Sequence, residues 1–285
     1  MTALYRGMTA EALSFEYNLR ARTPDHPAFI AGWETGSIAA GETLRGRRDL
    51  PYGPGPRRKI DIFPAAKPDA PVLAFIHGGY WQNMSREMFH YLAPTFVENG
   101  VTFAAIGYAL CPDVTLPALV DEVREAMGWL HANVRDHGGD PDRLHVAGHS
   151  AGGHLAAMMM ATGWGERGLP ADMIKSGCAI SGVYDLEPVR HTYLNDVLKL
   201  DAGTAQAVSP IFTPPRGGAP LICAVGAHEP SEFLRQQDDF ATAWRSAGMN
   251  VHIVDLPDRH HFSAVNALGE ADHPLHRTVL AMMGA

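Results

Sequence analysis

The sequence has little of what marks a disulfide-stabilised or membrane-spanning protein. Only three of its 285 residues are cysteines, Cys111, Cys178 and Cys223. Their odd number and wide spacing favour buried thiols in a reducing compartment over a disulfide framework. No run of 18 apolar residues occurs, and the N-terminus has no stretch like a signal peptide. We therefore expect a soluble, cytoplasmic protein that does not enter a membrane.

An excess of positive charge is also absent. The 23 Lys and Arg residues are outnumbered by 31 Asp and Glu residues, which gives a net charge of −8. The densest basic cluster, residues 57–59, is short and is expected to be the solvated edge of a hairpin. Because nucleic-acid binding requires a basic patch or stripe facing the phosphates, this charge balance argues against a nucleic-acid partner.

Hydrophobic residues, in contrast, make up 46% of the chain, which is ample for the core of one large α/β domain. Apolar or alternating runs predict strands over residues 71–77, 101–108, 144–147, 173–180, 221–225 and 251–256. Helical patterns separate them, over residues 90–99, 116–134, 154–161 and 232–247, and a closing helix is expected over 274–283. Strands that alternate with helices predict a mostly parallel sheet with helices on both faces.

Three segments lie outside this alternation. Residues 1–44 are expected to form a helical arm or lid near the mouth of the site, with helices over 9–20 and 28–40. Residues 184–215 are irregular and contain prolines, and we expect them to cross over the site. A hairpin over 46–63 precedes the first buried strand. Neither helix of the arm can bury its apolar face alone, so the whole chain is expected to be a single domain.

The most informative motif is Gly-His-Ser-Ala-Gly at residues 148–152. It follows a predicted strand and precedes a predicted helix, and strand, G-x-S-x-G and helix in this order predict a nucleophile elbow with Ser150 at its apex. Glycine is expected on either side because larger side chains would clash with the neighbouring backbone. The alternative is a tight turn with an inert serine.

A second glycine-rich stretch, His-Gly-Gly-Tyr-Trp at residues 77–81, follows another predicted central strand. Paired glycines let the backbone approach a substrate closely and direct amide groups toward it. We assign the oxyanion hole to the N–H groups of Gly79, Tyr80 and Ala151, with Gly78 shaping the loop. The alternative is a plain glycine turn.

A serine nucleophile needs a base, and the base needs a group that orients it. In this type of fold the chain order is serine, acid, histidine, so the base is sought after the last strand. His261 is the first choice there and His260 the second. A pair of histidines can also indicate a metal, but no third ligand follows at a recognisable spacing, so no metal site is expected.

For the acid, Glu229 is the carboxylate between the strand at 221–225 and the next helix. Its alternative interpretation is a helix N-terminal carboxylate favoured by the helix dipole. Asp255 and Asp258 remain rivals for the role of the acid.

Three aromatic residues, Tyr80, Trp81 and Tyr108, lie at predicted strand ends, where open α/β sheets bind ligands. They are candidates for lining an aromatic substrate pocket. The alternative is that they are large residues at the rim of the core.

Taken together, HGGYW at 77–81, GHSAGG at 148–153 and HFS at 261–263 resemble the α/β-hydrolase superfamily. More narrowly, they resemble its arylformamidase (kynurenine formamidase) branch, which is related to hormone-sensitive-lipase-type esterases and has HGG-x-W where the esterases have HGGG. Residues 226–229 resemble the G-x-x-D acid loop of this family, with glutamate at the aspartate position. The resemblance extends from about residue 50 to the C-terminus, and the N-terminal arm also looks like that of bacterial arylformamidase-like members.

The resemblance implies a cofactor-free serine hydrolase that cleaves an N-formyl aromatic amide, N-formylkynurenine in the family, to an aryl amine and formate through a covalent acyl-enzyme. The alternative is a carboxylesterase for small acyl esters, because both reactions pass through the same kind of tetrahedral intermediate. A third interpretation is a binding protein that has the fold without the chemistry. The expected partner is therefore a small aromatic amide or ester, with a homodimer left open.

Overall fold

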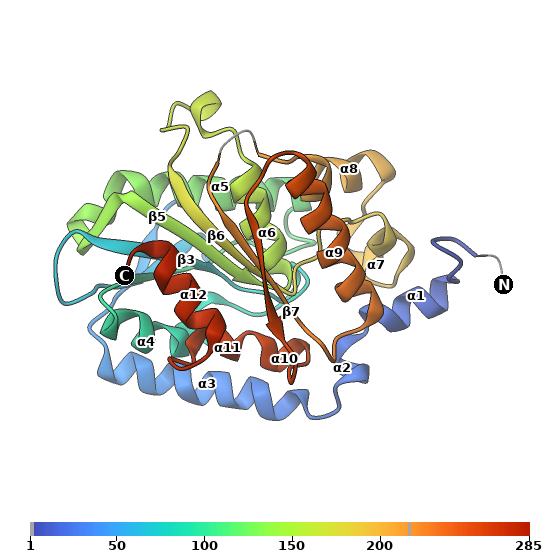
Figure 1. The fold of residues 1–285 in the computed structure, drawn as a ribbon, viewed down its shortest axis with the longest axis horizontal. Coiled ribbons are helices and arrows are strands. Elements are labelled where there is room, and N and C mark those ends of the chain that lie inside the picture. The colour runs from blue at the N-terminus through green and yellow to red at the C-terminus, as the bar shows by residue number, and fades with distance from the viewer. Residues whose placement is uncertain (1–2, 216–217) are drawn as a thin grey trace.

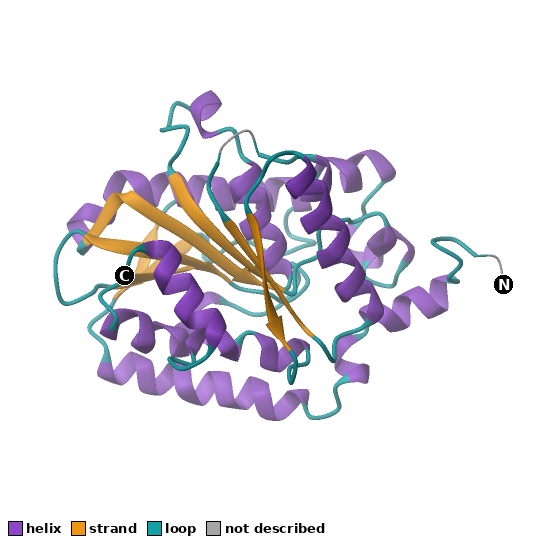
Figure 2. Cartoon of the chain, in the orientation of Figure 1, coloured by secondary structure: helices purple, strands orange, loops and turns teal. Residues whose placement is uncertain are grey.

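A twisted sheet of eight strands runs through the centre of the computed structural model, which describes residues 3–215 and 218–285 (Figures 1 and 2). The strands lie in the order β1-β2-β4-β3-β5-β6-β7-β8. Their bounds are β1 Arg47–Pro51, β2 Lys59–Phe63, β3 Ala70–Ile76, β4 Thr102–Ile106, β5 Gly139–His149, β6 Ile174–Ile180, β7 Leu221–Gly226 and β8 Val251–Leu256. The pairs β1–β2 and β2–β4 are antiparallel and the others are parallel, which confirms the predicted fold class.

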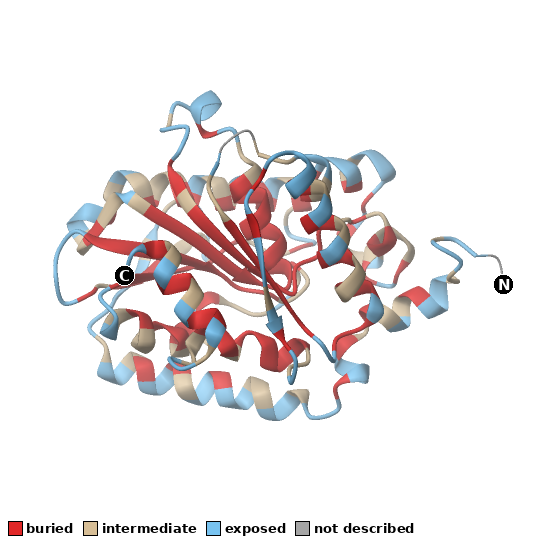
Figure 3. Cartoon of the chain, viewed as in Figure 1, coloured by how far each residue is buried: buried red, intermediate tan, exposed pale blue. Residues whose placement is uncertain are grey.

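Helices cover both faces of the sheet, and this is why its central strands consist of continuous apolar residues. On one face lie α5 (Leu116–Asn133), α6 (Ala151–Ala161) and α9 (Ser231–Ser246), and on the other lie α4 (Ala93–Glu98) and α12 (Pro274–Met283). Figure 3 shows the buried sheet between helices whose outer faces are exposed. None of the described helices is both long and apolar enough to span a bilayer.

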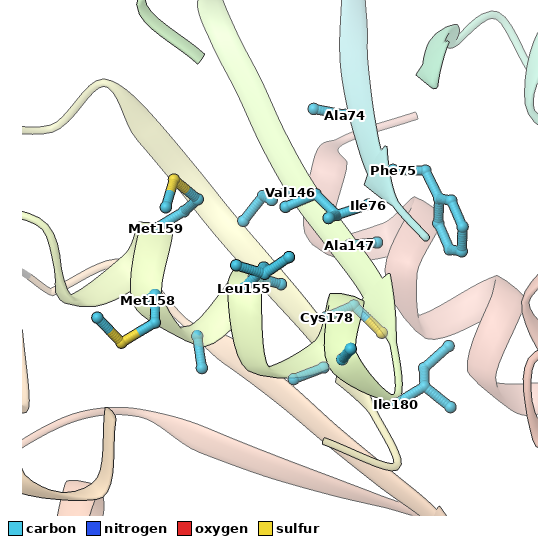
Figure 4. Packing of buried hydrophobic residues seen from close by; sticks show 14 of the residues in the cluster. Ala74, Phe75, Ile76, Val146, Ala147, Leu155, Met158, Met159, Cys178 and Ile180 are labelled. Carbon is cyan, nitrogen blue, oxygen red and sulfur yellow. The ribbon is translucent and has the colours of Figure 1, made fainter. Parts of the chain in front are cut away.

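The helix that follows the candidate nucleophile is buried on nearly all sides. Leu155, Met158 and Met159 of α6 pack against apolar side chains of the neighbouring strands, such as Val146 and Cys178 (Figure 4). A helix surrounded by protein needs no polar face, which explains its run of small and apolar residues. All three cysteines are likewise buried and free, as predicted.

The N-terminal arm consists of α1 (Ala10–Tyr17), α2 (Leu19–Arg22) and α3 (His26–Thr43). The single helix predicted over 9–20 divides at Asn18, whose side chain caps α2 by accepting a hydrogen bond from the Ala21 amide (3.3 Å). The third helix begins earlier than predicted because Pro27 lies in its first turn, where proline costs no hydrogen bond. In Figure 1 this helix runs along one edge of the molecule, outside α4.

The remaining helical elements are short turns between these units. They are η1 Arg86–Leu92, η2 Val134–His137, η3 Trp164–Arg167, η4 Pro188–His191, α7 Asn195–Leu198, α8 Ala202–Ala207, η5 Pro210–Phe212, α10 His261–Ala264 and α11 Asn266–Gly269. Four of them lie within residues 184–215, so this segment is more regular than predicted. Its buried apolar residues, among them Val189 and Leu198, hold it to the body of the protein.

The strand register brings the two glycine motifs together. Ile76 at the end of β3 pairs with Gly148 of β5, so the loop after β3 and the turn after β5 leave the sheet side by side. The strand order reverses between β3 and β5, and sites in open α/β sheets form at such a reversal, beyond the carboxyl ends of the strands.

Candidate active site

The turn between β5 and α6 holds Ser150 in a strained conformation. Its φ of 59° and ψ of −121° lie outside the regions that non-glycine residues normally adopt. A Cβ atom on Gly148 would lie 2.1 Å from the Gly152 carbonyl oxygen, and one on Gly152 would lie 1.9 Å from the Ile76 carbonyl oxygen. Glycine is therefore required on both sides of the serine, which presents Ser150 at the N-terminus of α6.

A histidine and a glutamate form a buried pair beside this turn. The Nδ1 atom of His261, the first residue of α10, lies 2.6 Å from Glu229 Oε2. With Nδ1–H donating to the carboxylate, Nε2 of the neutral ring is left as a proton acceptor. His261 and Ser150 line the same pocket. The arrangement can accept a serine proton and stabilise the imidazolium that results.

The rival residues occupy other environments. Asp255, on the edge strand β8, and Asp258 are both exposed, and neither forms a hydrogen bond with His261 in the described chain. The His260 ring caps α10, with Nδ1 accepting from the Phe262 and Ser263 amides at 3.2 and 3.3 Å. Glu229 and His261 are thus the acid and histidine that the fold brings together.

The carboxylate of Glu229 has two further donors. Its Oε1 atom accepts hydrogen bonds from the Ser181 hydroxyl and from the Gly226 amide (2.9 Å). Together with His261 Nδ1–H, these donors satisfy a buried charge and fix its orientation. Sequence reasoning missed Ser181, and its only signal was a position directly after a predicted strand, β6.

Removing the Ser181 hydroxyl should weaken this support without removing any reacting group. We expect Ser181→Ala to lower kcat about tenfold, because a hydrogen bond to a charged group contributes about 1.5–3 kcal/mol. Ser181→Thr, which keeps the hydroxyl, is the matched variant and should retain more activity. Steady-state kinetics of both variants test this, and equal losses would show that the hydroxyl has no such role.

The loop after β3 approaches the serine turn closely. A Cβ atom on Gly78 would lie 2.8 Å from the His149 carbonyl oxygen, and Gly79 and Tyr80 have left-handed φ values of 107° and 49°. Among the described residues, no main-chain carbonyl accepts from the amides of Gly79, Tyr80 or Ala151. These N–H groups are therefore free to donate to a developing oxyanion.

Two of the three aromatic residues expected in the substrate pocket are not in it. Trp81 is fully buried and its indole N–H donates to His154 Nδ1 (3.1 Å). Tyr108 is also fully buried, and its hydroxyl donates to the His77 carbonyl oxygen (2.7 Å). Both belong to the core beneath the loop, whereas the adjacent Tyr80 lines the pocket.

The basic cluster at residues 57–59 also differs from its prediction as a solvated edge. Arg57 is half-buried, and its guanidinium donates to the carbonyl oxygens of Tyr108 (3.0 Å) and Met84. Met84 belongs to the loop that follows β3, so Arg57 connects the hairpin to that loop. Met84 also lines the pocket.

The pocket above Ser150 has a volume of about 300 Å³. The arm contributes Asn18, Leu19, Arg20 and Trp33 to its wall, and residues 184–215 contribute Tyr193 and Leu194. Tyr80 and Phe262 add further aromatic surface. This volume is at the small end of the range for ligand pockets.

Four buried histidines, three of them around the site, are held neutral by burial. The His149 Nε2–H group donates to the His261 carbonyl oxygen (2.9 Å), and burial lowers its pKa well below the ordinary value. Burial likewise lowers the pKa of His77 to about 3, and the pKa values of His145 and His154 to about 4. These rings act as fixed hydrogen-bonding partners and not as proton carriers near neutral pH.

This burial predicts a loss of stability in mild acid. The unfolded chain binds protons on these histidines near pH 6.5, whereas the folded chain does not, so stability is full above pH 6.5 and falls as the pH drops below it. At pH 5.5 each of the four histidines should cost about 1 kcal/mol. Urea unfolding at pH 7.5 and 5.5 tests this, and an unchanged free energy of unfolding would contradict it. His145→Gln, which is remote from Ser150, should remove about 1 kcal/mol of this dependence.

A serine on a strained strand-to-helix turn, a buried Glu–His pair and a glycine loop at the carboxyl edge of a mostly parallel sheet define an α/β-hydrolase. The family model BD-FAE matches residues 60–213, more than half of the chain, and the protein therefore belongs to that family.

The relatives that the chain resembles include kynurenine formamidases, an esterase and a protein described as a thioesterase. The chain is 28% identical to a kynurenine formamidase of Danio rerio over 98% of both chains. It is 32% identical to a kynurenine formamidase of Salmo salar over 83% of this chain and 81% of that one. Esterase LipQ of Mycobacterium tuberculosis is 32% identical over 75% of this chain and 56% of its own. The crystal structure of a protein from Silicibacter sp. TM1040, described as a thioesterase, superposes on this chain with a TM-score of 0.83. The two are 28% identical, and the match covers 96% of this chain and 99% of that one. The protein is thus a hydrolase related to kynurenine formamidases and esterases.

Proposed function

We propose that the protein hydrolyses an N-formyl aromatic amide to an aryl amine and formate, with Ser150, His261 and Glu229 as its catalytic triad. The observation that carries the proposal is the similarity to the Danio rerio kynurenine formamidase over 98% of both chains. That similarity includes the N-terminal arm, which supplies part of the pocket wall.

The reaction proceeds in two halves. Ser150 Oγ attacks the formyl carbon while His261 Nε2 takes its proton, and Glu229 stabilises the imidazolium through Nδ1–H. The amides of Gly79, Tyr80 and Ala151 stabilise the oxyanion. The C–N bond then breaks, and His261 gives the proton to the departing aryl amine. Water, deprotonated by the same histidine, attacks the formyl-enzyme and releases formate, and the proton returns to Ser150.

The residues that line the pocket and the chemistry of the leaving group support a formyl donor with an aromatic leaving group. A formyl carbon has no side chain, so the acyl part needs almost no space beside Ser150. The aromatic side chains of Trp33, Tyr80 and Phe262 offer surfaces on which an aryl ring can pack. An aryl amine is also a better leaving group than an alkyl amine, which favours cleavage of this kind of amide.

The second candidate function is a carboxylesterase for small acyl esters. The observation that favours it is the 32% identity to Esterase LipQ. The same triad and oxyanion donors serve ester cleavage, with an alcohol leaving instead of an amine.

A parallel assay on N-formylkynurenine and p-nitrophenyl acetate separates the two, with Ser150→Ala as the blank. A much higher kcat/KM for the formamide, absent in the blank, supports the proposal. Cleavage of the ester alone would make the esterase the function, and no turnover of either compound above the blank would contradict both.

A further inference from the structure

The pocket wall contains one charged side chain that the proposed hydrolysis does not use. Arg20, in α2 of the arm, lines the pocket together with Ser150 and His261. Within the described chain its guanidinium has no hydrogen-bond or ion-pair partner. The nearby carboxylate of Glu16 is already engaged, because Oε1 pairs with Arg22 (2.9 Å) and Oε2 accepts from the Ser231 hydroxyl (2.7 Å).

No aspartate or glutamate is among the described residues that line the pocket. The one carboxylate directly behind it, Glu229, is buried and paired with His261. The Arg20 charge also acts on the neighbouring Tyr193, where it opposes the rise in pKa that burial causes. An anionic group that enters the pocket therefore meets a cation without a competing carboxylate, although the protein as a whole carries a net charge of −8.

Hydrogen bonds hold the part of the arm that carries this arginine in place. The carbonyl oxygen of Tyr17, at the end of α1, accepts from the hydroxyl groups of Tyr80 (2.8 Å) and Tyr193 (3.4 Å). Asn18 then caps α2. The start of α2 is thus tied to two residues of the pocket wall, which fixes the backbone that carries Arg20, while the exposed Arg20 side chain remains free to meet a ligand.

The position of Arg20 also indicates which part of a substrate it contacts. A formyl carbon bound at Ser150 has no substituent that extends beyond the oxyanion loop. In a formyl substrate, the leaving group is therefore the part that can extend toward α2. Guanidinium groups bind carboxylates through paired, charge-assisted hydrogen bonds.

We infer that Arg20 binds a carboxylate on the leaving group and selects substrates whose leaving group is anionic. The formamide part of this inference rests on the proposed function, whereas selection by charge applies equally to an ester.

Two matched substrate pairs test the inference. Formanilide and 4-formamidophenylacetate form the amide pair, and phenyl acetate and 4-acetoxyphenylacetate form the ester pair. The readout is the ratio of kcat/KM for the charged over the neutral member. We expect a ratio above one in the native protein and a fall of about tenfold in Arg20→Gln, mainly through KM. Arg20→Lys should restore part of the ratio, and 0.5 M salt should lower it in the native protein.

The matched control is Arg277→Gln, an exposed arginine on α12 that does not line the pocket, and it should leave the ratio unchanged. A ratio that Arg20→Gln does not alter would overturn the inference, as would equal losses on both members of a pair.

If only the esters react, the proposed function fails while the ester pair still tests Arg20. If no substrate reacts, calorimetric binding of 4-aminophenylacetate against aniline gives the same comparison, and equal affinities in the native protein would overturn the inference.

Discussion

Ser150→Ala is expected to abolish hydrolysis, with kcat reduced about 10⁵-fold. The variant loses the hydroxyl that the strained turn presents beside His261, and water alone must then attack the substrate. Alanine has the same backbone requirements as serine at a φ of 59°, so the fold should persist. The measurement is single-turnover kinetics on whichever substrate the native protein cleaves, with thermal unfolding as the check on folding.

The control for this variant is Ser246→Ala, which removes an exposed hydroxyl at the end of α9 and should retain full activity. A fluorophosphonate probe should label the native protein and Ser246→Ala but not Ser150→Ala. Persistent labelling or turnover in Ser150→Ala would show that another residue is the nucleophile.

Glu229→Gln is expected to lower kcat about 10³–10⁴-fold. The amide has nearly the same shape as the carboxylate, but it carries no charge to stabilise the imidazolium. Its NH₂ group must also replace one of the two acceptor oxygens, so it faces either the His261 ring N–H or the Ser181 and Gly226 donors. The loss should lie in kcat and not in KM, because Glu229 lies behind the histidine and does not line the pocket.

Asp255→Asn and Asp258→Asn are the controls for the acid. Each removes one exposed carboxylate by the same chemical change, and each should keep nearly full turnover. The reverse result, with Glu229→Gln active and one of these variants inactive, would transfer the role of the acid to that aspartate.

Much of this architecture is local in origin and was predictable from the sequence. The buried strands are continuous apolar runs, and their separation by helices requires parallel pairing. The turn at Ser150 was predictable because its glycines meet backbone atoms within the same strand–turn–helix unit or on the adjacent strand. The order of loops along the chain made Glu229 and His261 the first choices, since each loop follows a strand whose end lies at one edge of the sheet, and the structure pairs these two residues.

The features that sequence reasoning missed depend on side-chain direction and on distant contacts. Trp81 was expected in the pocket, yet it is buried in the core while the neighbouring Tyr80 lines the pocket, and residue types alone do not reveal that difference. Ser181 supports a glutamate 48 positions away, and Arg57 reaches the carbonyl of Tyr108, 51 positions away.

The sequence by itself thus determined the class of fold and the candidate nucleophile, because short-range patterns encode them, and it narrowed the base to His261 or His260 and the acid to Glu229, Asp255 or Asp258. Only the tertiary structure decided which side chains support these groups and which line the pocket, including Arg20 on the arm. Those relations arise when segments far apart in the chain pack together, and their geometry is set by the whole fold and not by any one motif.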